Sequence, residues 1–294
     1  NFSQSGQQLS QVGIVVYGVF LIAEGTLTMG SLIACVILSG RTLAPLGQVS
    51  NLLGRFNQAM TAYANFGRLM QQPVKEINRS GQVRVDKIEG QITITNASLT
   101  YPEQKEAVIK QVNLNVAAGE KIAIVGKIAS GKTSLLRIIT GLYDPSEGSV
   151  KIDKSDITHM HPDDIRNHIG VVMQIPMLFS GTLKENLLMG NPNATDKEMI
   201  AAAKLANVDE IASSLSDGYE TVIAEGGKEL SGGQRQAICI ARAFVGDPKI
   251  IIMDEPSSAM DSGSEQQLLE KLKDRLVDKT LILITHRGTL LSLV

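Results

Sequence analysis

The fold of this 294-residue chain is decided by the stretch Gly126-Lys127-Ile128-Ala129-Ser130-Gly131-Lys132-Thr133. An apolar run from Lys121 to Val125 precedes it and predicts a buried strand, and an apolar helical pattern from Ser134 to Thr140 follows it. Two glycines separated by four residues, followed by Lys and Thr, fit the template of a phosphate-binding loop. The sequence therefore predicts a nucleotide site between this strand and this helix.

The residue types in this phosphate loop (residues 126–133) suit a bound phosphate. Gly126 and Gly131 let the backbone turn, so that successive N–H groups point into one concavity at the start of a helix. Lys132 would reach the β- and γ-phosphates, and the Thr133 hydroxyl would bind Mg²⁺. A glycine-rich turn without a ligand is the alternative, but the strand, the helix and all four fixed positions together favour the nucleotide.

The composition limits the possible partners. The chain is longer than one usual domain, so two structural units are expected. A formal net charge of -2, the absence of Trp and a low aromatic content give no basis for nucleic-acid binding. The two cysteines, Cys35 and Cys239, lie far apart in apolar surroundings, which indicates inert packing and no disulfide framework. No secretory signal pattern opens the chain.

Residues 11–39 are much more apolar than the rest of the chain. The first run, Val12 to Ala23, is too short to span a bilayer alone. A second run begins near Met29 and is long enough for a helix that crosses a membrane and continues beyond it. Three arginines, Arg41, Arg55 and Arg68, follow this run and mark the cytoplasmic side. The alternative is a pair of buried helices in a large soluble domain.

The membrane interpretation predicts three parts. Residues 1–72 would be the C-terminal part of a transmembrane domain: the end of one span, an outer loop, the last span and its cytoplasmic extension. Residues 73–90 are polar and mixed in charge and predict a linker, with Pro73 ending the helix. Residues 91–294 would be the nucleotide-binding domain, truncated at its C-terminus. Because the chain begins abruptly within an apolar region, we expect a fragment of a longer protein.

The nucleotide-binding part shows two kinds of pattern. Residues 91–97 alternate between apolar and polar, and residues 108–116 give a second early strand, which together suggest an antiparallel β layer. Further along, apolar strands alternate with helical segments, which predicts an α/β fold with a mostly parallel sheet covered by helices. The expected strands lie at 121–125, 150–152, 170–173, 250–253 and 281–284, and the expected helices at 131–140, 162–168, 196–206, 232–245 and 261–277.

Two adjacent carboxylates end one of these strands. Ile250 to Met253 is a buried apolar run, and Asp254 and Glu255 follow it. Because α/β sheets bind ligands at the carboxyl ends of their strands, this pair should lie beside the phosphate loop. Asp254 would hold Mg²⁺ in the Walker-B role, and Glu255 would polarise the attacking water as general base. An isolated Asp-Glu pair would be read as two solvated acids; the phosphate loop changes that.

A second glycine-rich motif precedes this strand by about twenty residues. The signature turn, Leu230-Ser231-Gly232-Gly233-Gln234, runs directly into a helix, so it can present Ser231 and backbone N–H groups to a phosphate. About one hundred residues after a phosphate loop, this combination resembles the ATP-binding cassette (ABC) family. The resemblance covers the chain from roughly Val85 onward and implies a P-loop NTPase fold and ATP hydrolysis with Mg²⁺.

The resemblance also implies roles for single residues. Tyr101 matches an aromatic that stacks on adenine, and Gln174 matches a glutamine that contacts Mg²⁺ and water. The segment Ser257 to Asp261 (loop 257–261) matches a loop that signals across a dimer, and His286 matches a switch histidine near the γ-phosphate. The expected catalytic residues are Glu255, His286, Gln174 and Lys132. The expected metal ligands are Thr133, Gln174 and Asp254. The expected ATP-binding residues are Tyr101, Gly126, Lys127, Ser130, Gly131, Lys132, Thr133, Ser134, Ser231, Gly232, Gly233 and Gln234.

In ABC proteins the phosphate loop of one subunit faces the signature motif of the other, so the resemblance implies a homodimer. Helices ahead of the cassette resemble exporters, and details such as Met260 and Thr285-His286-Arg287 resemble bacterial type I secretion ATPases that export toxins and adhesins. The implied setting is the bacterial inner membrane, multi-pass and in contact with lipid, with the ATP-binding domain cytoplasmic. The implied partners are an exported polypeptide, a periplasmic adaptor and an outer-membrane channel, with no nucleic acid.

Two alternatives stay open. Exporters of drugs, lipids or peptides share almost all of these features. A soluble non-transport ABC ATPase fits less well, because the interval from Thr133 to Leu230 leaves no room for a long coiled-coil insertion and only one phosphate loop is visible. Departures from the family are Lys154-Ser155, where many relatives have Gly, and the end at Val294, before the usual final strands.

Overall fold

A computed structural model describes residues 2–71, 82–102, 104–127 and 129–294. The chain divides into two compact units, Asn1–Lys75 and Glu76–Val294, and each is described by itself. The predicted linker at 73–90 lies outside the described residues as far as residue 81. From Gln82 onward the described chain packs on the second unit, where Val83 forms a β-bridge with Met160.

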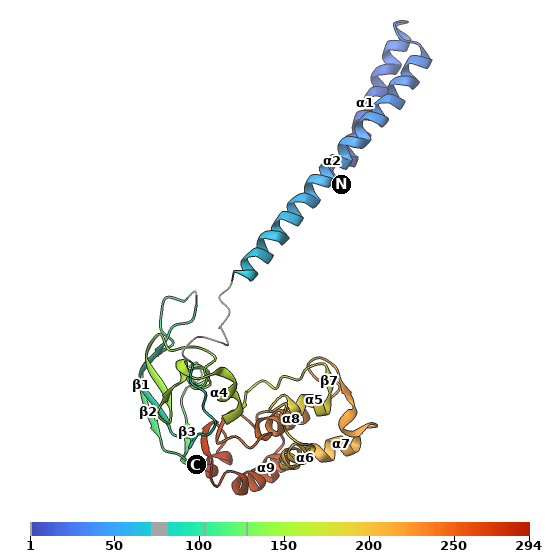
Figure 1. Ribbon diagram of the computed structural model, residues 1–294. Helices are drawn as coiled ribbons and strands as arrows, with labels where there is room; N and C mark the ends of the chain where they lie inside the picture. Colours follow the sequence, from blue (N-terminus) through green and yellow to red (C-terminus); the bar gives the residue numbers. More distant parts are fainter. Residues whose placement is uncertain (1, 72–81, 103, 128) are drawn as a thin grey trace. The chain divides into compact units, whose positions relative to one another are not determined.

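The first unit is a pair of helices. Helix α1 (Phe2–Ala23) lies alongside the N-terminal half of the longer helix α2 (Met29–Met70), as Figure 1 shows. Thr28 caps α2 by accepting a hydrogen bond from the Ser31 N–H. The two helices approach closely at Gly18, where an added Cβ would lie 2.2 Å from a Leu32 methyl group. Gly18 therefore sets the spacing of this pair.

The surfaces of both helices carry large apolar side chains that are exposed within this chain, among them Phe20, Ile33 and Phe56. Even so, among the described residues no helix reaches the combination of length and hydropathy that a membrane crossing needs. The expectation that the run from Met29 crosses a membrane is therefore not supported by the structure.

The second unit begins with an antiparallel sheet whose strand order is β2-β1-β4-β5. These strands are β1 (Ile92–Leu99), β2 (Ile109–Val116), β4 (Glu147–Ile152) and β5 (Ser155–Asp156). The predicted antiparallel layer is confirmed. The expected strand at 150–152 belongs to this layer, as part of β4, and not to the parallel sheet, because β4 pairs with β1 along most of its length.

The parallel sheet has the order β3-β10-β9-β6. Its strands are β3 (Lys121–Ile124), β6 (Ile169–Val172), β9 (Ile250–Asp254) and β10 (Thr280–Ile284). Both faces are buried: in β9, Ile250 and Ile252 face the core shared with β1 and α3, while Ile251 and Met253 face the core shared with α8. This explains why the strands read as continuous apolar runs. The registers align Ile284 with both Ile124 and Asp254, so the carboxyl ends meet at one edge.

Helices cover this sheet and extend the unit. Figure 1 shows α5, α7 and β7 at the end of the unit away from β1 and β2. The predicted α/β fold is confirmed, and the five expected helices correspond to α3, α4, α6, α8 and α9. The remaining bounds are α3 (Lys132–Ile139), α4 (Pro162–His168), α5 (Leu183–Leu188), α6 (Asp196–Leu205), α7 (Val208–Ser214), α8 (Gly232–Phe244), α9 (Ser262–Arg275), β7 (Gly181–Thr182), β8 (Val222–Ile223) and the short 3-10 helices Ile157–His159, Gly218–Glu220 and Leu290–Leu293.

Asp247, in the turn between α8 and β9, ties this turn to α9 through charge. Its Oδ1 lies 2.7 Å from Lys279 Nζ and 2.8 Å from Arg275 Nη2. Partial burial alone would raise the pKa of Asp247, but the hydrogen bond from Lys279 and the positive charges of Lys279 and Arg275 lower it. Lys279 is buried and donates its other bond to Pro248 O. The ion pairs of Asp247 with Lys279 and Arg275 therefore stabilise the fold only while Asp247 is ionised.

We expect Asp247→Asn to lower the free energy of unfolding at pH 7 by about 1 kcal/mol, a value limited by solvent screening. Because the pKa of Asp247 is lowered on folding, this stabilisation is fully present above the ordinary Asp pKa of about 3.9 and is lost as the pH falls through the lower folded value. The thermal stabilities of the variant and wild type should therefore begin to converge as the pH falls below about 4, and should coincide only below the lowered folded pKa of Asp247. Asp278→Asn, an exposed site nearby, is the control; an equal effect there would contradict the assignment.

Candidate functional site

The candidate site lies at the edge where the four parallel strands end. The phosphate loop follows β3, Gln174 follows β6, Asp254 ends β9, and His286 follows β10. These segments border one cavity of about 660 Å³. Its lining includes the predicted residues Ser130, Gly131, Lys132, Thr133, Ser134, Gln174, Asp254, Glu255 and His286. The sheet topology thus brings together side chains that are up to 156 residues apart (Ser130 to His286).

The phosphate loop leaves the start of α3 without a side-chain cap. Gly131 is the N-cap residue, with φ of 89°, a left-handed conformation that favours glycine, and no side chain accepts from the first turn. Uncapped N–H groups at a helix start are donors for an anion. Lys132 Nζ donates to the carbonyls of Gly126 and Lys127, 2.8 Å away in each case, and so holds its charge above the loop. Ile128, inside this loop, lies outside the described residues.

Thr133 and Asp254 meet at the base of the cavity. The Thr133 hydroxyl donates to Asp254 Oδ2 over 2.7 Å, and Asp254 is only 2% exposed. Gln174 lines the same cavity. A hydroxyl, a carboxylate and an amide oxygen form the donor set that suits Mg²⁺. The residues present therefore fit a divalent cation.

Glu255 directly follows β9 and has an unusual backbone conformation. Its φ is 47°, and its N–H donates to Ile284 O over 2.8 Å. One carboxylate oxygen, Oε2, lies 3.5 Å from the Thr285 hydroxyl. The other, Oε1, is buried without a hydrogen-bond partner and lies 3.7 Å from His286 Nε2, too far for a hydrogen bond. An acceptor with no partner at this position suits a bound water.

Tyr101 does not line this cavity. Its hydroxyl donates to Ser134 Oγ over 2.9 Å and accepts from Arg137 Nη1 over 3.0 Å. Its ring packs edge-on against Tyr143, with centroids 4.9 Å apart. The structure thus places Tyr101 beside Ser134, and its hydroxyl bonds to two side chains of α3.

The signature turn borders a different cavity, of about 240 Å³, together with Met260 and Asp261. Ser231 caps α8 by accepting from the Gln234 N–H, and the Gln234 side chain accepts from the Ser231 N–H, forming a capping box. The predicted binding residues therefore fall into two groups within one chain: the phosphate-loop group at the 660 Å³ cavity and the signature group at this second cavity.

Two polar residues at the first cavity were not among the predicted catalytic, metal or ATP-binding residues. Ser258 and Arg287 both line it. Arg287 directly follows His286 at the end of β10, and that adjacency was the available signal. In the sequence, Arg287 contributed only to the resemblance to type I secretion ATPases and received no role in the site.

A phosphate loop, a buried Asp at the end of a neighbouring strand and an α/β sheet define a P-loop nucleotide-binding protein. The ABC transporter family model matches residues 109–258, and the chain belongs to this family.

Curated relatives extend the match to almost the whole chain. It is 35% identical to the leukotoxin export ATP-binding protein LtxB of Aggregatibacter actinomycetemcomitans, over 97% of this chain and 40% of that protein. It is 36% identical to the leukotoxin translocation ATP-binding protein LktB of Mannheimia haemolytica, with the same coverage. The chain thus spans about 40% of the length of these relatives.

A solved structure of an ABC exporter also matches almost the whole chain. A bacterial Atm1-family ABC exporter with ATP bound matches with a TM-score of 0.71 and 30% identity, covering 96% of this chain and 49% of that one.

Proposed function

We propose that this chain is the ATP-hydrolysing part of a membrane exporter and couples ATP binding and hydrolysis to export. One observation carries the proposal: a single cavity joins the phosphate loop, the Thr133–Asp254 pair and the Glu255–His286 pair. This set can bind a triphosphate, hold a cation beside it and orient a water molecule.

Each residue has a distinct part in the proposed reaction. The N–H groups of the phosphate loop and the Lys132 side chain bind the β- and γ-phosphates. To do so, Lys132 replaces its hydrogen bonds to the loop carbonyls with hydrogen bonds to phosphate oxygens. Asp254 and Thr133, with Gln174, would hold Mg²⁺, which neutralises charge that develops on the phosphates. Glu255 Oε1 accepts a proton from the attacking water, and His286 lies beside that oxygen to orient the group.

The active unit in this proposal is a homodimer in which each ATP is held between the phosphate loop of one copy and the signature turn of the other. The support is the division of predicted residues between two cavities of the same chain. Ser231 and the N-terminus of α8 would complete the phosphate site of the partner copy.

The relatives support the proposed setting. Two of them are named for leukotoxin export or translocation, and the structural neighbour is an ABC exporter. We therefore place the protein at the bacterial inner membrane with its ATP-binding part cytoplasmic, in type I protein secretion with an exported polypeptide, a periplasmic adaptor and an outer-membrane channel. The exposed apolar residues of α1 and α2 would contact lipid or further helices.

Magnesium-dependent ATP hydrolysis tests the proposal. The complete protein should release phosphate from ATP in the presence of Mg²⁺. Removal of divalent cations with a chelator should abolish turnover, while a fluorescent ATP analogue should still bind, because the phosphate loop binds without the metal. Turnover at the same rate without a divalent cation would contradict the roles of Asp254 and Thr133.

A further inference from the structure

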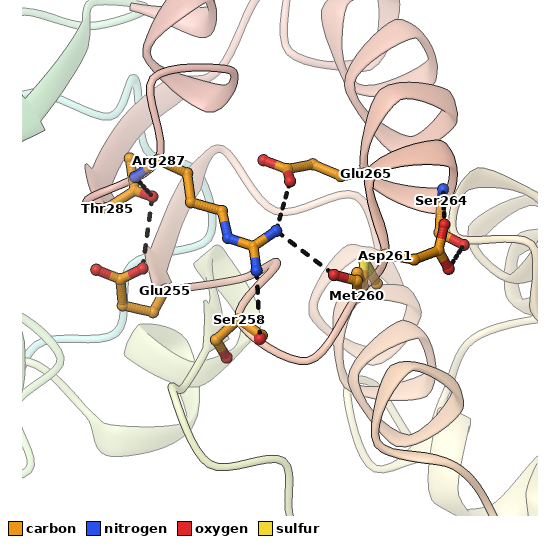
Figure 2. A network of polar contacts seen from close by, with 8 residues as sticks. All are labelled: Glu255, Ser258, Met260, Asp261, Ser264, Glu265, Thr285 and Arg287. Carbon is orange, nitrogen blue, oxygen red and sulfur yellow. Dashed lines mark hydrogen bonds and ion pairs between the residues drawn. The ribbon is translucent and has the colours of Figure 1, made fainter.

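Arg287 lies at the centre of a polar network that includes Glu255, and the reaction described above gives Arg287 itself no part (Figure 2). Its Nη1 donates to Glu265 Oε2 over 2.6 Å. The same guanidinium also reaches two backbone carbonyls of loop 257–261: Met260 O at 3.4 Å and Ser258 O at 3.5 Å. One side chain on the strand-end segment after β10 thus contacts both α9 and the loop that precedes it.

The main chain of Arg287 is linked to the predicted general base, Glu255, through Thr285. Its N–H donates to Thr285 Oγ1 over 3.1 Å, and Thr285 Oγ1 lies 3.5 Å from Glu255 Oε2. Thr285 is 1% exposed, so this link is fixed inside the unit. Figure 2 shows Glu255 and Thr285 on one side of Arg287, and Glu265 with loop 257–261 on the other. Arg287 therefore connects the general base to this loop within one chain.

The far side of loop 257–261 packs on the signature turn. A Cβ added at Gly232 would lie 3.3 Å from Ala259 Cβ, and one added at Gly233 would lie 3.3 Å from Ala259 O. The next residue, Met260, borders the same cavity as Ser231. A displacement of this loop would therefore shift the signature turn, because the two segments approach so closely at Gly232 and Gly233 that an added Cβ would crowd Ala259.

The charges around this network suit arginine and no other residue. Glu265 is 4% exposed, and its Oε1 has no hydrogen-bond partner, so Arg287 is the cation that compensates this buried carboxylate. The planar guanidinium group of arginine can donate to the carboxylate and to the loop carbonyls together. The ammonium group of a lysine is a single point of charge. Glu265 lies in the first turn of α9, so its ion pair holds the Arg287 guanidinium against a helix.

We propose that Arg287 is a positioning residue that couples the two half-sites of each chain, by holding loop 257–261 between the Glu255–Thr285 pair and the signature turn. The proposal rests on the proposed function, because it says which residue positions the parts of that same ATP site. Arg287 itself performs no chemistry in it. It sets the position from which Ser231 would meet the partner's nucleotide.

A purely structural ion pair is the competing explanation, and two variants separate it from coupling. Arg287→Met leaves Glu265 buried without a cation and should lower the melting temperature. Adding Glu265→Met removes that carboxylate and should restore the melting temperature. If Arg287 only stabilises the fold, the double variant regains turnover. If it positions the loop, kcat in the double variant stays about tenfold below wild type while KM for ATP stays within about twofold.

Hydrogen exchange provides a readout that needs no hydrolysis. In the double variant, amides of loop 257–261 should exchange about tenfold faster than in wild type, because two loop carbonyls lose their donor, while amides of β9 stay protected. Arg275→Met, which removes an arginine of α9 from its ion pair with Asp247, is the matched control and should leave the loop unchanged.

The outcomes distinguish this proposal from the proposed function. If the complete wild-type protein does not hydrolyse ATP, the proposed function is wrong. The hydrogen-exchange result would still decide whether Arg287 holds loop 257–261. Wild-type exchange of loop 257–261 in the double variant would overturn the coupling, as would recovery of kcat together with the melting temperature. Faster exchange with low kcat and unchanged KM would support it.

Discussion

Replacing Glu255 by Gln should lower ATP turnover by about 100-fold or more while ATP still binds, since a general base contributes that much to a proton transfer. The amide keeps the size and the hydrogen-bonding reach of the side chain but cannot take a proton. The Glu255 backbone, with φ of 47° and its N–H bonded to Ile284, does not depend on the carboxylate, so the fold should persist.

The measurement is phosphate release per protein together with the amount of ATP retained. Because hydrolysis is blocked after binding, the variant should accumulate as an ATP-bound dimer. Glu270→Gln on the exposed face of α9 is the matched control and should turn over normally. Near-normal turnover of Glu255→Gln would remove Glu255 from the role of general base.

Replacing Lys132 by Ala should weaken ATP binding by about 10- to 100-fold, which corresponds to one or two charge-assisted hydrogen bonds. Lys132 is the loop residue whose ammonium group already lies over the carbonyls of Gly126 and Lys127, next to the uncapped start of α3. Loss of its charge removes the attraction to the β- and γ-phosphates.

Calorimetric titration of the complete protein with ATP would measure this change. Lys154→Ala, an exposed lysine in the turn between β4 and β5, removes the same charge elsewhere and should leave the affinity unchanged. Because Lys132 also bonds loop carbonyls, the melting temperature should be recorded for both variants. An unchanged affinity for ATP in Lys132→Ala would contradict the assignment of the phosphate loop.

The sequence was sufficient for the parts of the fold in which a local pattern decides the structure. The continuous apolar runs predicted the parallel strands because both faces of that sheet are buried. The helices with long periodic patterns, such as α8 and α9, were also predicted within a few residues. The rule that ligands meet the carboxyl ends of parallel strands then placed Asp254 and Glu255 beside the phosphate loop, whereas Gln174 and His286 came from the family resemblance.

What the sequence could not supply depends on contacts between distant segments. Helices α5 and α7 are too short for a periodic pattern to appear. The position of Tyr101 is decided by Ser134 and Arg137, side chains more than thirty residues away. Arg287 acquires its contacts only because α9 and β10 bring Glu265 beside it.

The central claim is that each ATP site is composed from two copies of the chain, and a disulfide between copies tests it most directly. One copy carries Ser130→Cys and a differently tagged copy carries Ser231→Cys, both with Glu255→Gln to retain ATP and Cys35→Ser to remove the exposed native thiol. The account predicts that ATP produces a cross-linked species containing both tags, and that this species is scarce without nucleotide. Absence of the mixed species with ATP bound, or equal amounts with and without ATP, would contradict it.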